Sequence, residues 1–288
     1  MRHLAKLLPL ALLAAAPAPK AFPALWKVSD ADTTIYLFGT VHVLPAKLRW
    51  RDAAIDTALA RSDSLTLETV LDEQPGRVSE ILSTFGRAPG LPPLDQRVPA
   101  AKRPALLALV KASGLPLTAF QPFKTWAAAV LLTGVALRQM DLGADALGVE
   151  PQLEAQFRAA KKPVDGLETP EGQLGYFDRL PEASQRAFLV STLDSPSEQK
   201  KDFAETVAAW RRGDVRALEQ SFRDDPEFTP ALRDLLIRQR DRAWADAIQA
   251  RMTKPGTVFV AVGAGHLVGP DSVQRLLAAR GIKAERVQ

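Results

Sequence analysis

The two histidines that lie beyond the first twenty residues stand in the same local pattern. One closes the string Gly39-Thr40-Val41-His42, and the other closes Gly263-Ala264-Gly265-His266. Each string follows an apolar run, at 35–38 and 258–262, which is typical of a buried strand. The pattern predicts two strands that each end in a glycine turn with an imidazole at its tip. The glycines Gly39, Gly263 and Gly265 would let the backbone turn sharply and approach a metal or a substrate.

Two carboxylates follow other short strand-like runs. Glu68 ends the run 64–67, and Glu168 ends the run 162–167. Ligands of open α/β sheets bind outside the carboxyl ends of the strands, so we expect both carboxylates near His42 and His266. Two imidazoles and a carboxylate are a common ligand set for a divalent metal with a position open to water.

Such a metal would make its bound water more acidic and polarise a carbonyl group, which favours hydrolysis. A metal-free reaction is an alternative, in which a histidine or a glutamate acts on water as a general base. Each residue also has a structural interpretation. A histidine at a strand end is often held by backbone groups, Glu68 could be a surface carboxylate, and Thr169 before Pro170 is typical of a helix N-cap.

Arg240 and Asp241 fall on the apolar face of a predicted helix that also carries Ile237 and Trp244. Arg240 could pair with Asp241, orient the carboxylates of the site, or bind an anionic group of a substrate. We therefore expect Glu168 and Arg240 to support the site or to orient the substrate. Trp244 and Trp126 are expected in the core.

Composition excludes several classes of protein. The chain has no cysteine, so it has neither disulfides nor thiolate metal sites. Three of its 37 basic residues, and none of its 33 acidic ones, lie in the first 20 residues, so the rest of the chain is close to neutral. Nucleic-acid binding therefore has no electrostatic support. A dinucleotide fingerprint, a nucleophile elbow and a phosphate-binding loop are all missing from the sequence.

The N-terminus resembles a secretory signal, which we place at residues 1–21 with an uncertain cleavage point. Arg2 and Lys6 precede an apolar stretch of about ten residues, and small residues follow. The stretch is too short to span a bilayer. We therefore expect a periplasmic or secreted protein without a stable transmembrane anchor in its mature form.

The remaining pattern predicts an α/β fold with a central mixed β-sheet flanked by helices and a largely helical middle section. Two strands over 24–38 form a hairpin around Ser29-Asp30-Ala31-Asp32. We expect a single domain over 22–288, with helical insertions at roughly 72–145 and 182–252.

Several segments, taken in order, resemble the TraB/GumN family. They are Leu25-Trp26-Lys27-Val28, Tyr36 to His42, Leu67-Glu68, Lys124-Thr125-Trp126, Gly148-Val149-Glu150, Gly166 to Thr169 with Gln173, Arg240 with Trp244, and Val262 to Gly269. The sequence departs from the usual pattern at two positions. Glu150 stands where aspartate is common, and Asp241 stands where asparagine is common.

The family is similar to the Tiki metalloproteases and more distantly to erythromycin esterases and haem-binding ChaN proteins. This resemblance implies an α/β fold and metal-dependent peptide hydrolysis that uses His42, Glu68 and His266, with manganese or cobalt as the metal. The substrate would be a peptide or a small molecule. The alternative is a non-catalytic periplasmic protein that binds a small molecule or haem in the same pocket.

Overall fold

The computed structural model describes residues 22–45, 47–70, 76–140, 142, 148–224 and 229–288. The predicted signal segment therefore lies outside the described residues. Within the described part of the chain, no helix combines the length and the apolar character that crossing a bilayer requires.

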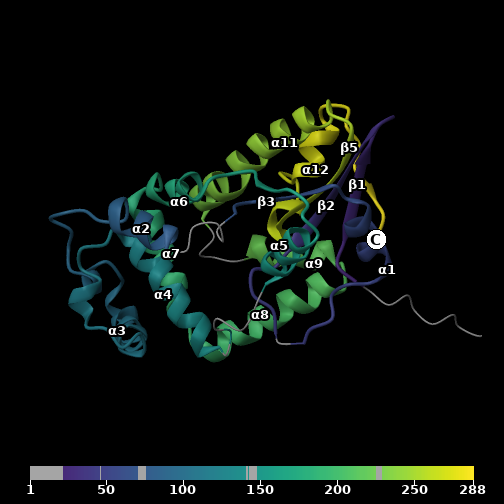
Figure 1. The fold of residues 1–288 in the computed structure, drawn as a ribbon. Helices are drawn as coiled ribbons and strands as arrows, with labels where there is room; N and C mark the ends of the chain where they lie inside the picture. Colours follow the sequence, from purple (N-terminus) through teal and green to yellow (C-terminus); the bar gives the residue numbers. More distant parts are fainter. Residues whose placement is uncertain (1–21, 46, 71–75, 141, 143–147, 225–228) are drawn as a thin grey trace, which may run out of the picture.

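Within these described residues, six strands form one sheet in the order β4-β3-β5-β2-β1-β6 (Figure 1). Their bounds are β1 Leu25–Ser29, β2 Thr33–Thr40, β3 Ser64–Leu67, β4 Val164–Gly166, β5 Gly256–Gly263 and β6 Glu285–Arg286. The pairs β2–β5, β5–β3 and β3–β4 are parallel, whereas β1 is antiparallel to both β2 and β6. The predicted mixed sheet and the predicted hairpin are thus both confirmed.

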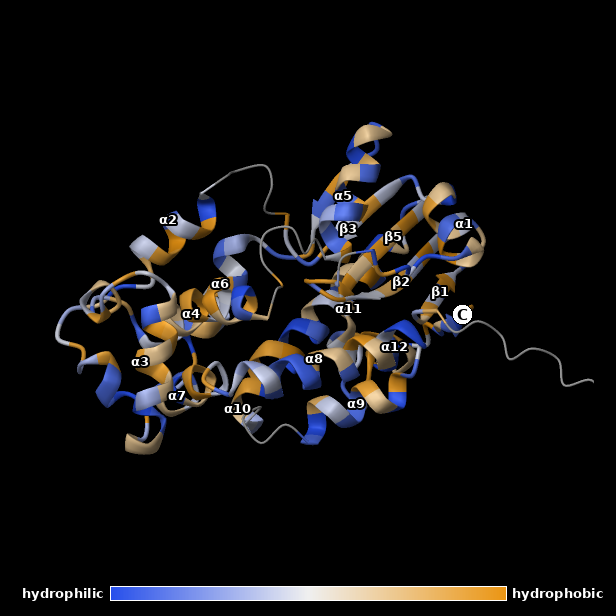
Figure 2. Ribbon diagram, turned by 90° about the horizontal axis from the view of Figure 1, so that it is seen from below, coloured by the Kyte–Doolittle hydropathy of each residue, from blue (hydrophilic) through white to orange (hydrophobic). Residues whose placement is uncertain are grey.

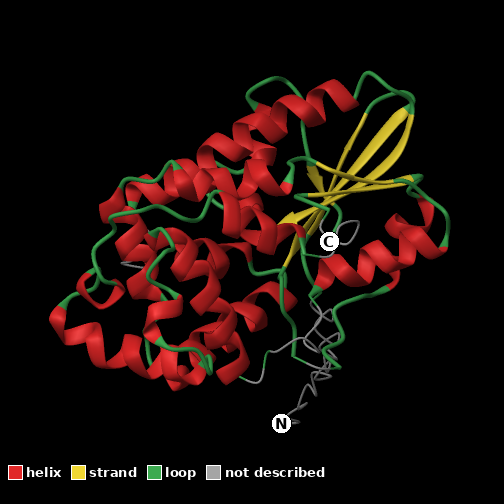
Figure 3. Cartoon of the chain, turned by 60° about the vertical axis from the view of Figure 1, so that its left-hand side comes forward, coloured by secondary structure: helices red, strands yellow, loops and turns green. Residues whose placement is uncertain are grey.

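Helices make up most of the remaining described structure (Figure 3). The α-helices are α1 Ala53–Arg61, α2 Arg77–Thr84, α3 Arg103–Ala112, α4 Thr125–Gln139, α5 Val149–Ala159, α6 Pro170–Asp178, α7 Glu182–Ser191, α8 Pro196–Arg211, α9 Val215–Asp224, α10 Pro230–Arg233, α11 Gln239–Arg251 and α12 Val273–Ala278. Shorter helical turns of the 3₁₀ or π type are η1 Leu94–Gln96, η2 Ala100–Lys102, η3 Leu117–Ala119, η4 Asp234–Arg238 and η5 Ala264–Leu267.

The sheet is covered on both faces because its central strands are apolar on both sides. Along β2, Tyr36 and Phe38 pack into one core with α1, α5, α8 and α9. Ile35 and Leu37, which point the other way as the two-residue period of a strand requires, pack into a second core with α11 and α12. The apolar colouring of β2 and β5 in Figure 2 follows this two-sided burial.

A separate group of helices lies to one side of the sheet (Figure 1). Its main core joins α3, α4 and α7 with η1 and η3, and a smaller one joins α2, α4 and α6. Helix α4, which begins at Thr125, is buried along much of its length. Trp126 lies in the core, as expected from the sequence.

Parallel pairing in register brings the two glycine–histidine strings together. Gly39 lies opposite Val262 and Thr40 lies opposite Gly263. On the other side of β5, Leu67 lies opposite Ala261, so Glu68 leaves β3 next to the end of β5. The carboxyl ends of β2, β3 and β5 therefore lie side by side at one end of the sheet.

Candidate functional site at the strand ends

His42, Glu68 and His266 converge on Gly263. A Cβ atom placed on Gly263 would lie 3.0 Å from Oε1 of Glu68, 3.6 Å from Cδ2 of His266 and 4.0 Å from Nε2 of His42. A larger residue at this position would enter the space that the three side chains share. The three residues that the sequence predicted as one group therefore lie close together in the fold.

Glu68 is buried and is held through both of its oxygen atoms. Oε1 accepts a hydrogen bond from the backbone N–H of Gly263 at 2.6 Å. Oε2 accepts from Arg240 at 2.7 Å and from the side-chain amide of Gln173 at 3.1 Å. Burial alone would raise the pKa of Glu68, but the nearby charges of His266, Arg240 and His42, with the Gly263 N–H, outweigh it and lower that pKa to about 2.

Arg240 joins the two glutamates that the sequence placed at strand ends. Its guanidinium lies 2.7 Å from Glu68 and 2.9 Å from Glu168, and all three side chains are buried. Trp244 also donates to Glu168 at 3.0 Å. Among the interpretations left open for Arg240, orientation of the site carboxylates agrees with these contacts, whereas a pair with Asp241 does not. Burial opposes the charge of Arg240, but the two glutamates overcome that effect and raise its pKa.

His266 is fixed on three sides. Its Nδ1 lies 2.6 Å from Oδ1 of Asp241, and its Nε2 lies 3.2 Å from Nη1 of Arg240. The ring of Trp244 packs against it with a centroid separation of 4.3 Å. Asp241 is completely buried, and this burial raises its pKa to about 6.

His42 also contacts a carboxylate, but its side chain is exposed to solvent. Its Nδ1 lies 2.8 Å from Oε1 of Glu150, which also accepts a hydrogen bond from the hydroxyl of Thr40. The imidazole side chain is 72% exposed. The Glu150 hydrogen bond is the dominant influence on this ring and raises the pKa of His42 to about 9. The same contact lowers the pKa of Glu150 against the effect of burial.

The other two predicted glycines make close backbone packing contacts. A Cβ on Gly39 would lie 3.1 Å from the backbone of Ala264, and the Gly39 carbonyl accepts a hydrogen bond from Trp210. A Cβ on Gly265 would lie 3.2 Å from the ring of Phe222. These two glycines let η5 approach β2 and α9, and the side chains of the site surround Gly263 instead.

Two contacts of the candidate site were missing from the predicted set of site residues. Glu150 and Asp241 each contact a histidine, whereas the sequence marked both as departures from a family pattern and Asp241 also as a possible partner of Arg240. Their positions could have indicated this role, because each is an acidic residue in the first turn of a helix that packs against the sheet. The prediction for Thr169 is confirmed, since its side chain caps α6 by accepting from Gly172 N–H.

The donor atoms of this centre are of the types that bind divalent cations. Each imidazole has its Nδ1 on a carboxylate, which is the usual outer contact of a metal-ligating histidine, and Glu68 adds an oxygen donor. Within the described residues, no three His, Asp or Glu side chains are arranged closely enough to hold an ion, and Nε2 of His266 accepts from Arg240 instead. A cation bound to His266 would have to replace that hydrogen bond.

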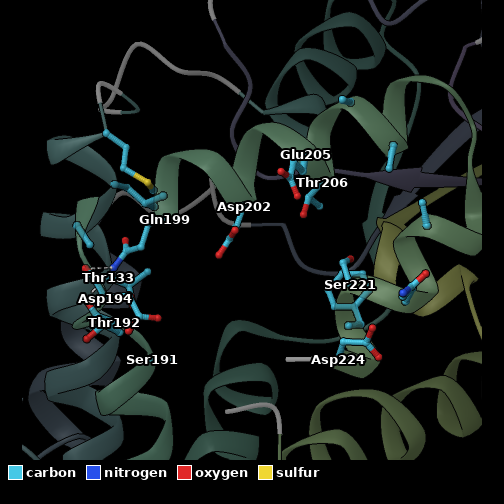
Figure 4. Close-up of a pocket in the computed structure, with 18 of the residues that line it drawn as sticks. Thr133, Ser191, Thr192, Asp194, Gln199, Asp202, Glu205, Thr206, Ser221 and Asp224 are labelled. Atoms are coloured by element: carbon cyan, nitrogen blue, oxygen red, sulfur yellow. Dashed lines mark hydrogen bonds between the residues drawn. The ribbon is translucent and has the colours of Figure 1, made fainter. Parts of the chain in front are cut away.

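A large cavity lies elsewhere. It measures about 1120 Å³ and lies among α4, α7, α8 and α9, with Asp202 extending into it from α8 (Figure 4). Several of its polar groups already bond within the protein: Thr133, Ser191 and Thr192 donate to carbonyls of their own helices, and Asp194 pairs with Lys102. We therefore place the candidate site at the strand ends.

The fold and the site define an α/β protein with a histidine–carboxylate centre at the carboxyl edge of parallel strands. The model of the TraB/PrgY/gumN family matches residues 24–286, so the chain belongs to this family. It is 24% identical over 263 residues to the uncharacterized protein YbaP of Escherichia coli (strain K12), a match that covers 89% of this chain and 92% of YbaP. YbaP of Shigella flexneri matches to the same extent. No solved structure gives a significant match.

Proposed function

We propose that this chain is a metal-dependent hydrolase, peptidase-like in its chemistry, that acts on a peptide or a small molecule with a hydrolysable carbonyl group. The observation that carries this proposal is the convergence of His42, Glu68 and His266 around Gly263. Carboxylate contacts at Nδ1 of both rings add support, because they leave each Nε2 directed away from its carboxylate partner.

Nε2 of His42, Nε2 of His266 and Oε1 of Glu68 would hold the cation. This set of nitrogen and oxygen donors without thiolates suits manganese or cobalt, which are the metals that we propose. When bound, the ion would supply an activated water molecule and polarise the carbonyl group of the substrate.

The hydrogen bonds of Glu68 bear on its role. Both of its oxygen atoms already accept hydrogen bonds, Oε1 from the N–H of Gly263 and Oε2 from Arg240 and Gln173. Glu68 is therefore better suited to hold positive charge than to remove a proton from water. Arg240 balances the charge of Glu68 and Glu168 and keeps both carboxylates in place.

Substrate would approach from the side of His42. This imidazole is 72% exposed, whereas the side chains of His266 and Glu68 are only 6% and 7% exposed. The signal-like pattern of residues 1–21 supports the further proposal that the enzyme acts in the periplasm or outside the cell.

The test is a hydrolysis assay with purified protein that has been stripped of metal and reloaded with Mn²⁺ or Co²⁺. A panel of peptides and esters serves as substrate, and His42→Ala, His266→Ala and Glu68→Gln are compared with the wild type. Asp246→Asn is the control, because Asp246 is exposed and pairs with Arg280. We expect turnover that a chelator abolishes and that all three site variants lose.

Absence of turnover together with absence of metal uptake would overturn the proposal. Haem binding without turnover would favour the non-catalytic alternative.

A further inference from the structure

Each histidine of the site is held by a carboxylate that comes from a helix outside the sheet. Glu150 lies in the first turn of α5 and contacts His42 at 2.8 Å, while Asp241 lies in the first turn of α11 and contacts His266 at 2.6 Å. The two contacts are equivalent, because both use Nδ1 of the ring and a single carboxylate oxygen.

The second oxygen of each carboxylate is poorly accommodated. Oε2 of Glu150 and Oδ2 of Asp241 are both buried and have no hydrogen-bond partner among the described residues. A buried oxygen without a partner costs stability, so folding alone gives no reason to place a carboxylate at either position. A role of each carboxylate in holding the imidazole ring that it contacts would explain why the protein tolerates this cost.

The contacts of His266 define which of its nitrogens carries the proton. A guanidinium can only donate hydrogen bonds, so Nε2 of His266 must accept from Arg240. In the neutral ring the proton is then on Nδ1, from which it is donated to Asp241. For His42, Nδ1 faces Oε1 of Glu150, an oxygen that Thr40 holds through its hydroxyl.

We propose that Glu150 and Asp241 are positioning residues that keep the proton of each neutral imidazole on Nδ1 and turn Nε2 toward the centre of the site. This inference rests on the proposed function for its purpose, since a ligating histidine must offer an unprotonated Nε2. The orientation of the rings is nevertheless a property of the metal-free protein and can be measured without a metal.

The experiment records the ring nitrogens of both histidines by ¹⁵N–¹H NMR in metal-free protein, across the titration of each ring. In the wild type we expect Nδ1–H in both neutral rings. Glu150→Ala and Asp241→Ala should each lose the Nδ1–H signal of the ring concerned, while Glu150→Gln and Asp241→Asn should retain it because an acceptor oxygen remains.

Glu154→Gln is the matched control, because Glu154 is a buried carboxylate on α5 that pairs with Arg158. Co²⁺ titration followed by absorption is the second readout. The alanine variants should bind Co²⁺ about 10- to 100-fold more weakly than the wild type, and the control should not change.

Wild-type rings that carry the proton on Nε2 would overturn the inference, even if no alanine variant folds. Folded alanine variants with unchanged ring signals would also overturn it. If the wild type shows Nδ1–H but takes up no Co²⁺, the positioning role stands and the proposed function fails.

Discussion

His42 and His266 occupy equivalent places in two similar strings, but their surroundings differ. His266 is buried between Asp241, Arg240 and Trp244, whereas His42 is exposed and rests on Glu150. His266 is therefore the enclosed side of the centre, and His42 is the side that is exposed to solvent. The two residues should respond differently to substitution of their neighbours.

The Glu150 contact predicts an unusual titration of His42. Its pKa is raised to about 9, so the contact stabilises the fold below the ordinary value of 6.5, and this contribution is lost as the pH rises through about 9. In Glu150→Gln the pKa should fall toward 6.5. An NMR titration of the His42 ring in metal-free protein measures both values, and a wild-type midpoint at or below 6.5 would contradict this prediction.

Gly263 offers a second test at the residue scale. In Gly263→Ala the new methyl group would lie 3.0 Å from Oε1 of Glu68, so this carboxylate must shift. We expect Mn²⁺ affinity to fall by about tenfold or more, as for other changes next to metal ligands. Isothermal titration measures the affinity. The same substitution at Gly134, where the nearest atom is 3.9 Å away, should leave it unchanged.

At the residue scale, the sequence predicted the members of the site better than their contacts. His42, Glu68, Glu168 and His266 were found because each follows a strand-like run. The partner of Asp241 could not be predicted, because helical spacing shows which face a residue occupies but not which strand end that face meets. Asp241 therefore appeared as a partner of Arg240, although it holds His266.

At the element scale, the contact between α5 and the end of β2 aligns Glu150 with His42. Gly148 precedes α5, and a Cβ there would lie 2.1 Å from the backbone carbonyl oxygen of His42. Val149 N–H also donates to the carbonyl of Val41 at 3.1 Å. The φ angle of Gly148 is −64°, which any residue can adopt. Glycine is needed here because a side chain would have no space between the backbone of residue 148 and that of His42.

A pair of glycine substitutions tests this contact. Gly148→Ala should destabilise the protein by about 1–3 kcal/mol, because the added atom meets backbone that must move. Gly134→Ala, inside α4 and in open space, should stabilise it by about 0.5–1 kcal/mol, because glycine is a poor helix former. Urea unfolding measures both effects, and equal stability of the two variants would refute the close approach.

Helices and strands could be predicted from the sequence where local residue patterns determine them. The continuous apolar run at 35–38 indicated β2, and Ser29 to Asp32 marked the hairpin turn. The position of β5 between β2 and β3 pairs it with segments that lie roughly 190 to 220 residues earlier in the chain, and no local signal gives that order. The convergence of the site depends on this pairing, so it remained a hypothesis until the sheet order was known.

On the scale of the whole molecule, the described residues form separate apolar cores for the sheet and for the lateral helices. Arg97 holds part of the helical group together. It is buried and donates hydrogen bonds to the carbonyls of Pro92, Gln121 and Phe123. We therefore expect that a substitution in the helical group can lower the stability of that group and leave the stability of the sheet unchanged.

Arg97→Ala should destabilise the helical group by roughly 3 kcal/mol, because it leaves buried carbonyls without donors. Hydrogen exchange followed by mass spectrometry should show faster exchange in α3 and α4 and little change in β2 and β5. Equally increased exchange in the sheet would show that the two parts unfold as one unit.

The proposed metal site at Gly263 can be tested most directly by crystallography. A crystal of the protein soaked in Mn²⁺ and measured near the manganese absorption edge gives an anomalous map of the bound metal. We predict one strong peak beside Gly263, within about 2.0–2.3 Å of Nε2 of His42, Nε2 of His266 and Oε1 of Glu68. A map with no peak at this position, or with manganese bound only elsewhere, would rule out the proposed metal site.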